Sequence, residues 1–207
     1  YFDEEHPEVV KKGHENELRY FYHQAHLPVR EQDEAFGHSV RAVYLYSGMA
    51  DVARVDDDDA LYEACLKLWN NITQKKMYVT GGIGATHLGE AFSFNYDLPN
   101  DTAYSETCAA IGLVFFARRM LEIKPDRSFS DVMERALYNT VLAGMAADGK
   151  SFFYVNPLEV YPKACHEDAR KFHVKPIRQK WFGCACCPPN IARLLSSLAM
   201  YAYTENE

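Results

Sequence analysis

Residues 36–76 read FGHSVRAVYLYSGMADVARVDDDDALYEACLKLWNNITQKK, and this stretch sets the expected fold. Apolar and small side chains recur at helical spacing from Val40 onward, which predicts an amphipathic helix over about residues 36–54. The aspartates at 56–59 can cap a second helix and favour its first turn, and this helix is expected to continue to about Lys76. Two helices joined by so short a connection predict a helical hairpin.

The same helical rhythm continues along the rest of the chain. Further helices are expected over about residues 103–122, 130–146 and 190–203, whereas residues 151–161 read as extended, as in a short β-hairpin. Residues 1–35 are polar and irregular. Because strands do not alternate with the helices, a parallel-sheet fold is disfavoured. The sequence therefore predicts an all-α fold, built from helical hairpins arranged as a toroid.

The bulk composition excludes several classes of partner. Lys plus Arg number 22 against 29 for Asp plus Glu, the formal net charge is −7, and the sequence contains no basic run. Such a chain lacks the positive surface that binds nucleic acid or an anionic membrane. No apolar run approaches the length of about 20 residues that spans a bilayer. The chain begins at Tyr1 rather than Met, so residues 1–207 are interpreted as a piece of a longer protein and as part of one domain.

Cysteine is concentrated in one short segment. Three of the six cysteines fall within Cys184-Ala185-Cys186-Cys187. Neighbouring cysteines pair poorly with each other because the bridge geometry is strained. A disulfide scaffold would spread its cysteines through a small, loop-rich domain, whereas this chain reads as helical. We therefore expect free thiols in a reducing compartment, the cytoplasm, with some of them bound to a metal ion.

Four residues offer a plausible ligand set for zinc. Glu106 and Cys108, together with the adjacent pair Cys186 and Cys187, supply one carboxylate and three thiolates, and zinc accepts both ligand types, commonly four at a time. The spacing differs from the Cys-x₂-Cys knuckle of a zinc ribbon. A single cysteine would more simply be a small buried hydrophobe. For this cluster, in a loop flanked by glycine and proline, metal binding or catalysis is the favoured interpretation.

The long glycine-rich loop over residues 78–103 is a second candidate, because loops of this length are usually functional or disordered. It lacks the Lys-Ser/Thr of a phosphate-binding loop and has no parallel strand before it. Glu90 stands among apolar residues there, and an apolar setting raises a carboxyl pKa and keeps the proton available for donation. From local sequence alone, a solvated loop glutamate is the simpler reading. His38, at a helix start, is by default a histidine satisfied at the edge of the core.

Several motifs together resemble a known enzyme family. In order along the chain they are HLPVREQDEAFGHSVRAVYLYSGMADVA, TGGIGATHLGEAF, AYSETCAAIG, MERALYN and GCACCPPN. They resemble the bacterial β-L-arabinofuranosidases of glycoside hydrolase family 127 and close relatives, from about His26 to the last helix. The resemblance implies that the chain is part of an (α/α)₆ barrel, which is followed in the family by β-rich domains. It also implies a retaining hydrolase that releases β-L-arabinofuranose from an arabinose-containing oligosaccharide or glycoconjugate.

The resemblance places roles on individual residues. It puts the zinc ligands on the same four residues, Glu106, Cys108, Cys186 and Cys187, and makes Cys186 the nucleophile. Glu90 matches the general acid/base that would serve both steps of the reaction. Substrate-binding positions fall on His38, Tyr154 and Glu134.

Two other readings stay open at this stage. In the first, the zinc is purely structural and the chain is a helical carbohydrate-binding or scaffolding module, because four protein ligands ordinarily make a closed structural site. In the second, the chain is a zinc hydrolase with an activated water, but that class typically uses histidine ligands, and no His-Glu-x-x-His is present. Part of a barrel would also expose apolar faces, from which we expect homodimerisation.

Overall fold

A computed structural model describes residues 15–203, and most of their regular structure is helical. Short 3₁₀ or π-helical turns complete it at Val29–Glu31 (η1), Ile72–Lys76 (η2), Leu88–Glu90 (η3), Leu137–Leu142 (η4) and Ala169–Lys171 (η5). The α-helices are α2 (Glu15–Tyr22), α3 (Ser39–Val55), α4 (Asp59–Asn71), α5 (Thr107–Ile123), α6 (Arg127–Ala136), α7 (Ala164–Glu167), α8 (Cys187–Ser196) and α9 (Ala199–Ala202).

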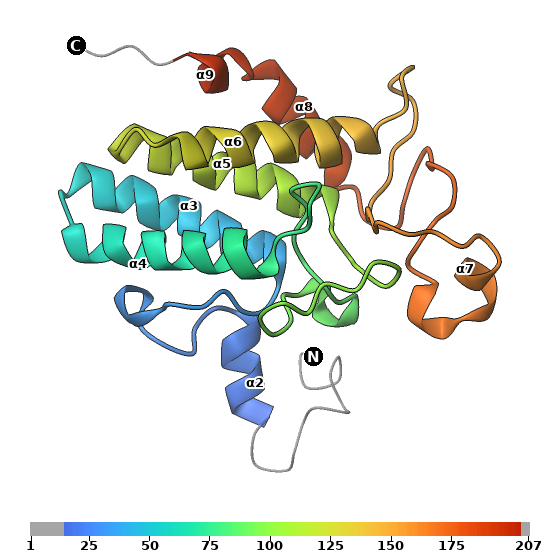
Figure 1. Ribbon diagram of the computed structural model, residues 1–207, viewed down its shortest axis with the longest axis horizontal. Coiled ribbons are helices and arrows are strands. Elements are labelled where there is room, and N and C mark those ends of the chain that lie inside the picture. Colours follow the sequence, from blue (N-terminus) through green and yellow to red (C-terminus); the bar gives the residue numbers. More distant parts are fainter. Residues whose placement is uncertain (1–14, 204–207) are drawn as a thin grey trace.

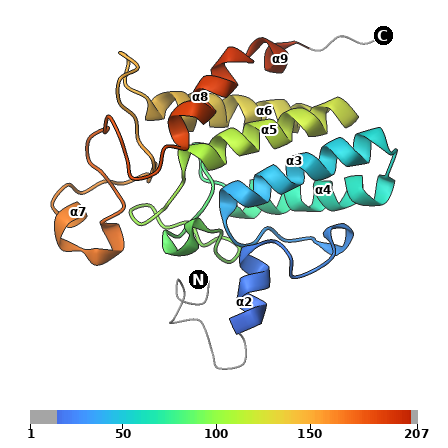
Figure 2. The same cartoon turned by 180° about the vertical axis from the view of Figure 1, so that it is seen from behind.

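Helices α3 to α6 form two layers, with α4 and α6 in front of α3 and α5 in Figure 1 and behind them in Figure 2. Helix α5 is the centre of the packing, because it contacts α3, α6 and α8, while α4 packs against α3. Its first half is buried all round, as expected for a helix that is apolar on every face. The ring of Trp69 on α4 packs edge-on against Phe116 of α5, with 5.6 Å between centroids, and against Phe129 of α6, with 5.0 Å.

The predicted hairpin of residues 36–76 is confirmed as α3 and α4. Asp58, from the run of aspartates, caps α4: its Oδ1 accepts a hydrogen bond of 2.9 Å from the backbone amide of Leu61. Beyond Asn71 the chain continues as the π-helical turn η2, so the helical stretch ends at Lys76, where the sequence places its end. No helix within residues 15–203 has the length and apolarity needed to cross a membrane.

Three expectations are wrong in detail. Helix α2 lies in the stretch that reads as irregular. Helix α5 begins at Thr107 rather than near 103, and α8 begins at Cys187 rather than 190. The prolines after Cys187 do not prevent an earlier start, since the first turn of a helix needs no amide hydrogen from them. Both shifts matter, because they put candidate ligands at helix N-termini.

The short β-hairpin expected over residues 151–161 is not seen; this segment makes only isolated bridges. Phe152 pairs with Met145 and with Gln179, and Val155 pairs with Glu106. The backbone of the segment therefore hydrogen-bonds to three different parts of the chain, so no two-stranded ladder forms. We call residues 152–156 the strap, because they fasten the start of α5.

The connecting segments gather at the end of the helical layer where α5 and α8 begin. Figure 2, the view from behind, shows the first turn of α8 beside the first turn of α5. Three helices present their N-cap residues at this end: His38 before α3, Glu106 before α5 and Cys186 before α8. Helix N-termini carry partial positive charge and unpaired amide hydrogens, which favour anionic groups such as thiolates and carboxylates.

Candidate active site

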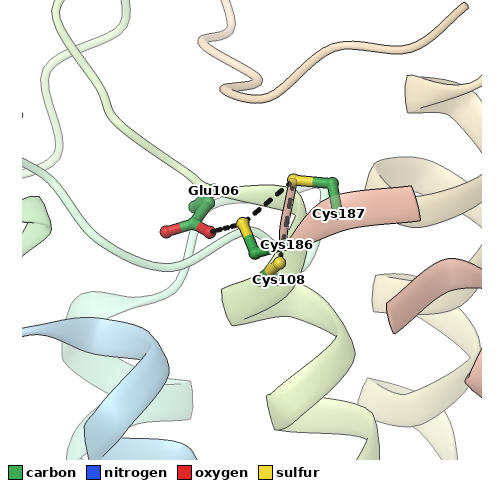
Figure 3. A group of neighbouring side chains, drawn as sticks. All are labelled: Glu106, Cys108, Cys186 and Cys187. Carbon is green, nitrogen blue, oxygen red and sulfur yellow. Dashed lines mark hydrogen bonds between the residues drawn. The ribbon is translucent and has the colours of Figure 1, made fainter. Parts of the chain in front are cut away.

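The four predicted metal ligands lie together, as Figure 3 shows. Oε1 of Glu106 lies 3.4 Å from Sγ of Cys186, and this sulfur lies 3.8 Å from Sγ of Cys187. Sγ of Cys108 lies 3.7 Å from that of Cys187. One donor atom from each residue falls within 4.8 Å of the others. Residues from two helix starts, far apart in the sequence, therefore converge on a single point.

The strap holds this arrangement from one side. The amide of Thr107 donates a 2.9 Å hydrogen bond to the carbonyl of Tyr154, and the Thr107 hydroxyl donates a 2.7 Å bond to the carbonyl of Phe153. The side-chain amide of Asn156 donates to the carbonyl of Ser105 at 3.0 Å. Ser105 has a left-handed φ of 41°, which is rare for a residue with a side chain and is held here by these bonds. The chain direction at Glu106 is thus fixed before the helix starts.

The charges in the cluster are strongly coupled. Burial raises the pKa of Glu106 to about 9, and the negative charges of Cys186 and Glu90 act in the same direction. The pKa of Cys186 is lowered, because Cys108 and Cys187 hydrogen-bond to its sulfur and the hydroxyl of Tyr154 lies 3.2 Å away. The pKa values of Cys108 and Cys187 are raised, chiefly because these two thiols act as hydrogen-bond partners of the others. Cys186 is therefore the thiol that ionises first.

The cluster fits a metal ion. Its four donor atoms lie within 4.8 Å of one another, and Glu106 is only 2% exposed. Ionisable groups buried this close together are costly when charged unless something else, such as a cation, balances them. Thiolate sulfur and carboxylate oxygen are both accepted ligands of borderline-soft divalent cations. Glu106, Cys108, Cys186 and Cys187 could therefore hold such an ion.

Glu90 lies beside this cluster in a constrained turn. It ends η3 with a left-handed φ of 53°, following Gly89 at 66°. Its carbonyl accepts a 3.0 Å hydrogen bond from the Ser39 hydroxyl, and a bridge between Ala91 and His38 ties the turn to the start of α3. Non-glycine residues held in this conformation cost about 1–3 kcal/mol and cluster at functional sites.

The carboxylate of Glu90 is paired with a histidine. Its Oε2 lies 3.2 Å from Nε2 of His38. Burial alone raises the pKa of Glu90, but the hydrogen bond and charge of His38, with the hydroxyl of Tyr104, outweigh burial and leave the pKa below its usual value. The expectation of a raised pKa is therefore wrong for this structure, because the sequence did not reveal these polar neighbours among the apolar residues of the loop.

A cavity of about 580 Å³ opens over these groups. The predicted site residues that line it are His38, Glu90, Glu106, Cys108, Tyr154 and Cys186. Cys187 is fully buried and does not line the cavity, although its sulfur belongs to the ligand cluster. Sequence reasoning missed other lining residues, among them Tyr22, Arg41, His87 and Asn190. His87, Arg41 and Asn190 had a signal, because each stands in a motif that carries the family resemblance; Tyr22 had none.

Glu134 is the one predicted site residue that the structure does not bring to this cavity. It lies on the exposed face of α6 and lines a different cavity with Ser130, Leu198 and Tyr201. The structure thus leaves its assignment to the substrate site without support. The physical reason is the helix period: Met133 and Leu137 turn inward on α6 and η4, so Glu134 turns outward.

Comparison with known proteins shows which family the chain belongs to. The model of the β-L-arabinofuranosidase GH127 catalytic domain matches residues 3–200. The chain belongs to this family. A relative is the non-reducing end β-L-arabinofuranosidase of Bifidobacterium longum subsp. longum, which is 48% identical over 186 residues. That match covers 90% of this chain but 28% of the relative.

Two solved structures of GH127 proteins are also similar. The crystal structure of Ara127N-Se, a GH127 β-L-arabinofuranosidase from Geobacillus stearothermophilus T6, is 60% identical with a TM-score of 0.88, over 90% of this chain and 29% of that chain. The GH127 β-arabinofuranosidase BT3674 is 44% identical with a TM-score of 0.79, over 98% of this chain and 32% of that chain. This GH127 chain thus spans under a third of the length of these relatives.

Proposed function

We propose that this chain carries the reaction centre of a retaining glycoside hydrolase that releases β-L-arabinofuranose from an arabinose-containing glycan. The observation that supports it most is that Sγ of Cys186 and the carboxylate of Glu90 line one cavity, with Glu106 close to both. A nucleophile and a proton donor that share a cavity are what a two-step glycosidase requires.

We further propose that the chain is part of a longer catalytic domain with an (α/α)₆ barrel. Support comes from the side-by-side helices and from the length of the relatives, which is more than three times that of the matched region. The remaining helices would continue the layer of α3 and α5 and the layer of α4 and α6 until the ring closes. Cytoplasmic location and homodimerisation stay predictions.

The proposed metal ion is zinc, held by Glu106, Cys108, Cys186 and Cys187. Two sulfurs on one tetrahedral zinc, each at about 2.3 Å, lie about 3.8 Å apart, and a carboxylate oxygen lies about 3.5 Å from such a sulfur. The corresponding distances here are 3.7 and 3.8 Å between sulfurs and 3.4 Å between oxygen and sulfur. When bound, zinc would keep the thiols deprotonated near neutral pH.

The proposed reaction proceeds through the protein's own residues. The sulfur of Cys186 attacks the anomeric carbon, and the bond from this carbon to the leaving oxygen breaks. Glu90 in its protonated form gives its proton to that oxygen, which departs as an alcohol. Because the pKa of Glu90 is lowered in the free site, Glu90 must take up this proton when the sugar binds. In the second step Glu90 takes a proton from water, the water oxygen bonds to the anomeric carbon, and the carbon–sulfur bond breaks.

Neighbouring residues prepare these two steps. His38 holds the carboxyl of Glu90 at 3.2 Å and fixes its direction. Tyr154 places its hydroxyl 3.2 Å from the Cys186 sulfur, where it stabilises negative charge on that atom before attack and after release. Both side chains also line the cavity, so each can offer a hydrogen bond to a sugar hydroxyl.

A structural zinc module without catalysis is the alternative. It is favoured by the closeness of all four donors, since four protein ligands ordinarily leave no open position. Under this alternative Cys186 would never form a bond to carbon.

The deciding experiment uses the full-length protein that contains this chain. It should hydrolyse an aryl β-L-arabinofuranoside, and a thiol-reactive β-L-arabinofuranosyl analogue should add one sugar mass to Cys186, located by peptide mass spectrometry. The substrate should protect Cys186 from labelling. A metal-loaded, folded protein without hydrolysis and without an adduct would reject the proposal in favour of the structural module.

A further inference from the structure

A second group of metal-type ligands adjoins the thiolate cluster. His38, Glu90 and Glu106 each place one ligand atom within 4.8 Å of the other two. Glu106 belongs to both groups, so the two share one carboxylate. The two carboxylates stand close together, Glu106 buried and Glu90 partly exposed. They can lie this close when Glu106 is protonated, as its raised pKa implies, or when both are ionised and a cation lies between them.

The second oxygen of Glu106 is the observation that points to a ligand here. Oε1 is occupied by its contact with Cys186, while Oε2 is buried without a hydrogen-bond partner. In Figure 3 one oxygen of Glu106 faces the sulfur and the other points away from the three cysteines. A carboxylate has enough lone pairs to bind a cation through each oxygen. Oε2 is therefore available to a cation on the side away from the sulfurs.

The spacing of the other two ligands suits the same kind of ion. Two nitrogen or oxygen ligands on one tetrahedral zinc, at about 2.0–2.1 Å each, lie about 3.3 Å apart. Nε2 of His38 and Oε2 of Glu90 lie 3.2 Å apart. Imidazole with carboxylate oxygen is a common set for zinc and similar divalent ions. A cation could thus replace the direct contact between the two side chains with little movement.

Charge also favours a second cation. With the proposed zinc bound, the three thiolates and one carboxylate of the first group have a net charge of −2. When ionised, Glu90 adds a further negative charge beside this group. Arg41 is the one Lys or Arg side chain among the described residues that line the cavity. The nearby field is therefore negative overall.

We propose that His38, Glu90 and Glu106 form a second, weaker site for a divalent cation such as zinc, bridged to the thiolate site through the carboxylate of Glu106. The cation would occupy the carboxylate that the proposed function uses as acid and base, so excess zinc would inhibit by competing with substrate. The inhibition rests on the proposed hydrolase function, whereas the binding rests only on the proposed metal ion in the thiolate site.

Cobalt titration tests the binding without any activity measurement. Cobalt(II) in the thiolate site gives intense sulfur-to-metal charge-transfer absorption, whereas a site with only nitrogen and oxygen ligands adds weak ligand-field bands. We expect the first equivalent to produce the charge-transfer bands and a second to add only the weak bands. His38→Gln should lower the affinity for the second cobalt ion by at least about 10-fold. The affinity for the first ion should not change, and this unchanged binding also shows that the variant folds.

His87→Gln is the matched control, because His87 lines the same cavity but is outside the ligand group. It should still bind both equivalents. Binding of a single equivalent by the unaltered protein would overturn the proposal. Equal loss of binding of the second ion in both histidine variants would overturn it too. Charge-transfer absorption from the second ion would also overturn it, because it would indicate a cysteine ligand such as Cys184.

Zinc inhibition of the full-length enzyme completes the test. Micromolar zinc added to the singly loaded enzyme should raise KM with little change in kcat. A second equivalent that binds but does not inhibit an active enzyme would refute the competitive role. Absence of any glycosidase activity in the unaltered enzyme would count against the proposed function instead, and would leave the spectroscopic result to stand by itself.

Discussion

Oε1 of Glu106 and Sγ of Cys186 lie 3.4 Å apart, although 80 residues separate them in the sequence. Each is the N-cap residue of a helix, α5 for Glu106 and α8 for Cys186. The side-by-side packing of the two helix starts therefore creates the contact. It places an ionisable thiol, a buried carboxylate and two helix N-termini at one point, and this is the feature on which the proposed chemistry depends.

Replacement of the proposed nucleophile should remove activity without unfolding the protein. We expect Cys186→Ser to lower kcat by at least about 1,000-fold, because the hydroxyl is not ionised at neutral pH. Cys165→Ser is the control, since Cys165 is a buried thiol on α7 outside the cavity. Steady-state hydrolysis by the full-length enzyme, with thermal unfolding of both variants, measures the effect. Near-normal turnover by Cys186→Ser would exclude the nucleophilic role.

Loss of the proposed acid/base should depend on the leaving group. Glu90→Gln should lower kcat/KM by about 10²–10⁴-fold for an alkyl arabinoside, whose oxygen needs a proton, and by much less for a nitrophenyl arabinoside. Glu134→Gln should behave as the unaltered enzyme, because Glu134 lies on α6 at a different cavity. If both substrates slowed equally in Glu90→Gln, proton donation would not be its role.

Metal removal should destabilise this chain. Zinc at 100 times its dissociation constant adds about 2.7 kcal/mol to the free energy of unfolding when it binds only the folded state. Chelation should therefore lower the melting temperature, and zinc should restore it. The Cys108→Ser variant should have the same melting temperature with and without zinc, because it lacks one of the four donors. Equal melting temperatures for the loaded and the chelated unaltered protein would argue against a bound metal.

Stability should fall in mild acid because of His173. The pKa of His173 is lowered from 6.5, chiefly by burial and also by the charge of the nearby His87. The ring of His173 stacks on the ring of His87, with 4.8 Å between the centroids. Above pH 6.5 both the folded and the unfolded chain keep it neutral, so its contribution is complete. Below that pH the unfolded chain takes up a proton that the folded chain does not, until the folded pKa is passed. The free energy of unfolding should drop by up to about 1.4 kcal/mol per pH unit in this window.

Urea unfolding at pH 7.5 and pH 5.5 measures this loss. His173→Phe should reduce the difference between the two pH values, since phenylalanine keeps the stacking and does not titrate. His166→Phe is the control, because His166 is exposed on α7. An unchanged pH dependence in His173→Phe would show that other groups cause the acid loss.

Two glycines should respond in opposite directions to alanine. A Cβ at Gly112, in the middle of α5, would lie 2.4 Å from Cγ2 of Val43, so Gly112→Ala should destabilise by about 1–3 kcal/mol as α3 and α5 are forced apart. A Cβ at Gly48 on α3 would meet nothing within 4 Å, so Gly48→Ala should stabilise by about 0.5–1 kcal/mol. Denaturant unfolding of both variants checks the sign, and destabilisation by both would contradict the packing described here.

The helices and the ligand set could be predicted because they depend on local patterns. The apolar spacing after Val40 and the capping aspartate at position 58 are enough to specify α3 and α4. The residue types at Glu106, Cys108 and the Cys186-Cys187 pair are unusual enough to indicate a metal site. The helix starts were displaced by a few residues, since propensity cannot show that the strap holds the chain out of the helix until Thr107 or that α8 begins before its prolines.

What the sequence alone determined about this protein is its helical class, the chemistry of its donor atoms and its family, because these follow from residue type and order. The tertiary structure alone decided which groups meet. It paired Glu90 with His38 and so lowered a pKa that the local sequence indicated should rise, and it turned Glu134 away from the cavity. The physical reason is that charge interactions and packing act over a few ångströms in space, and contacts between distant segments are set by how the helices pack rather than by the residues beside them in the chain.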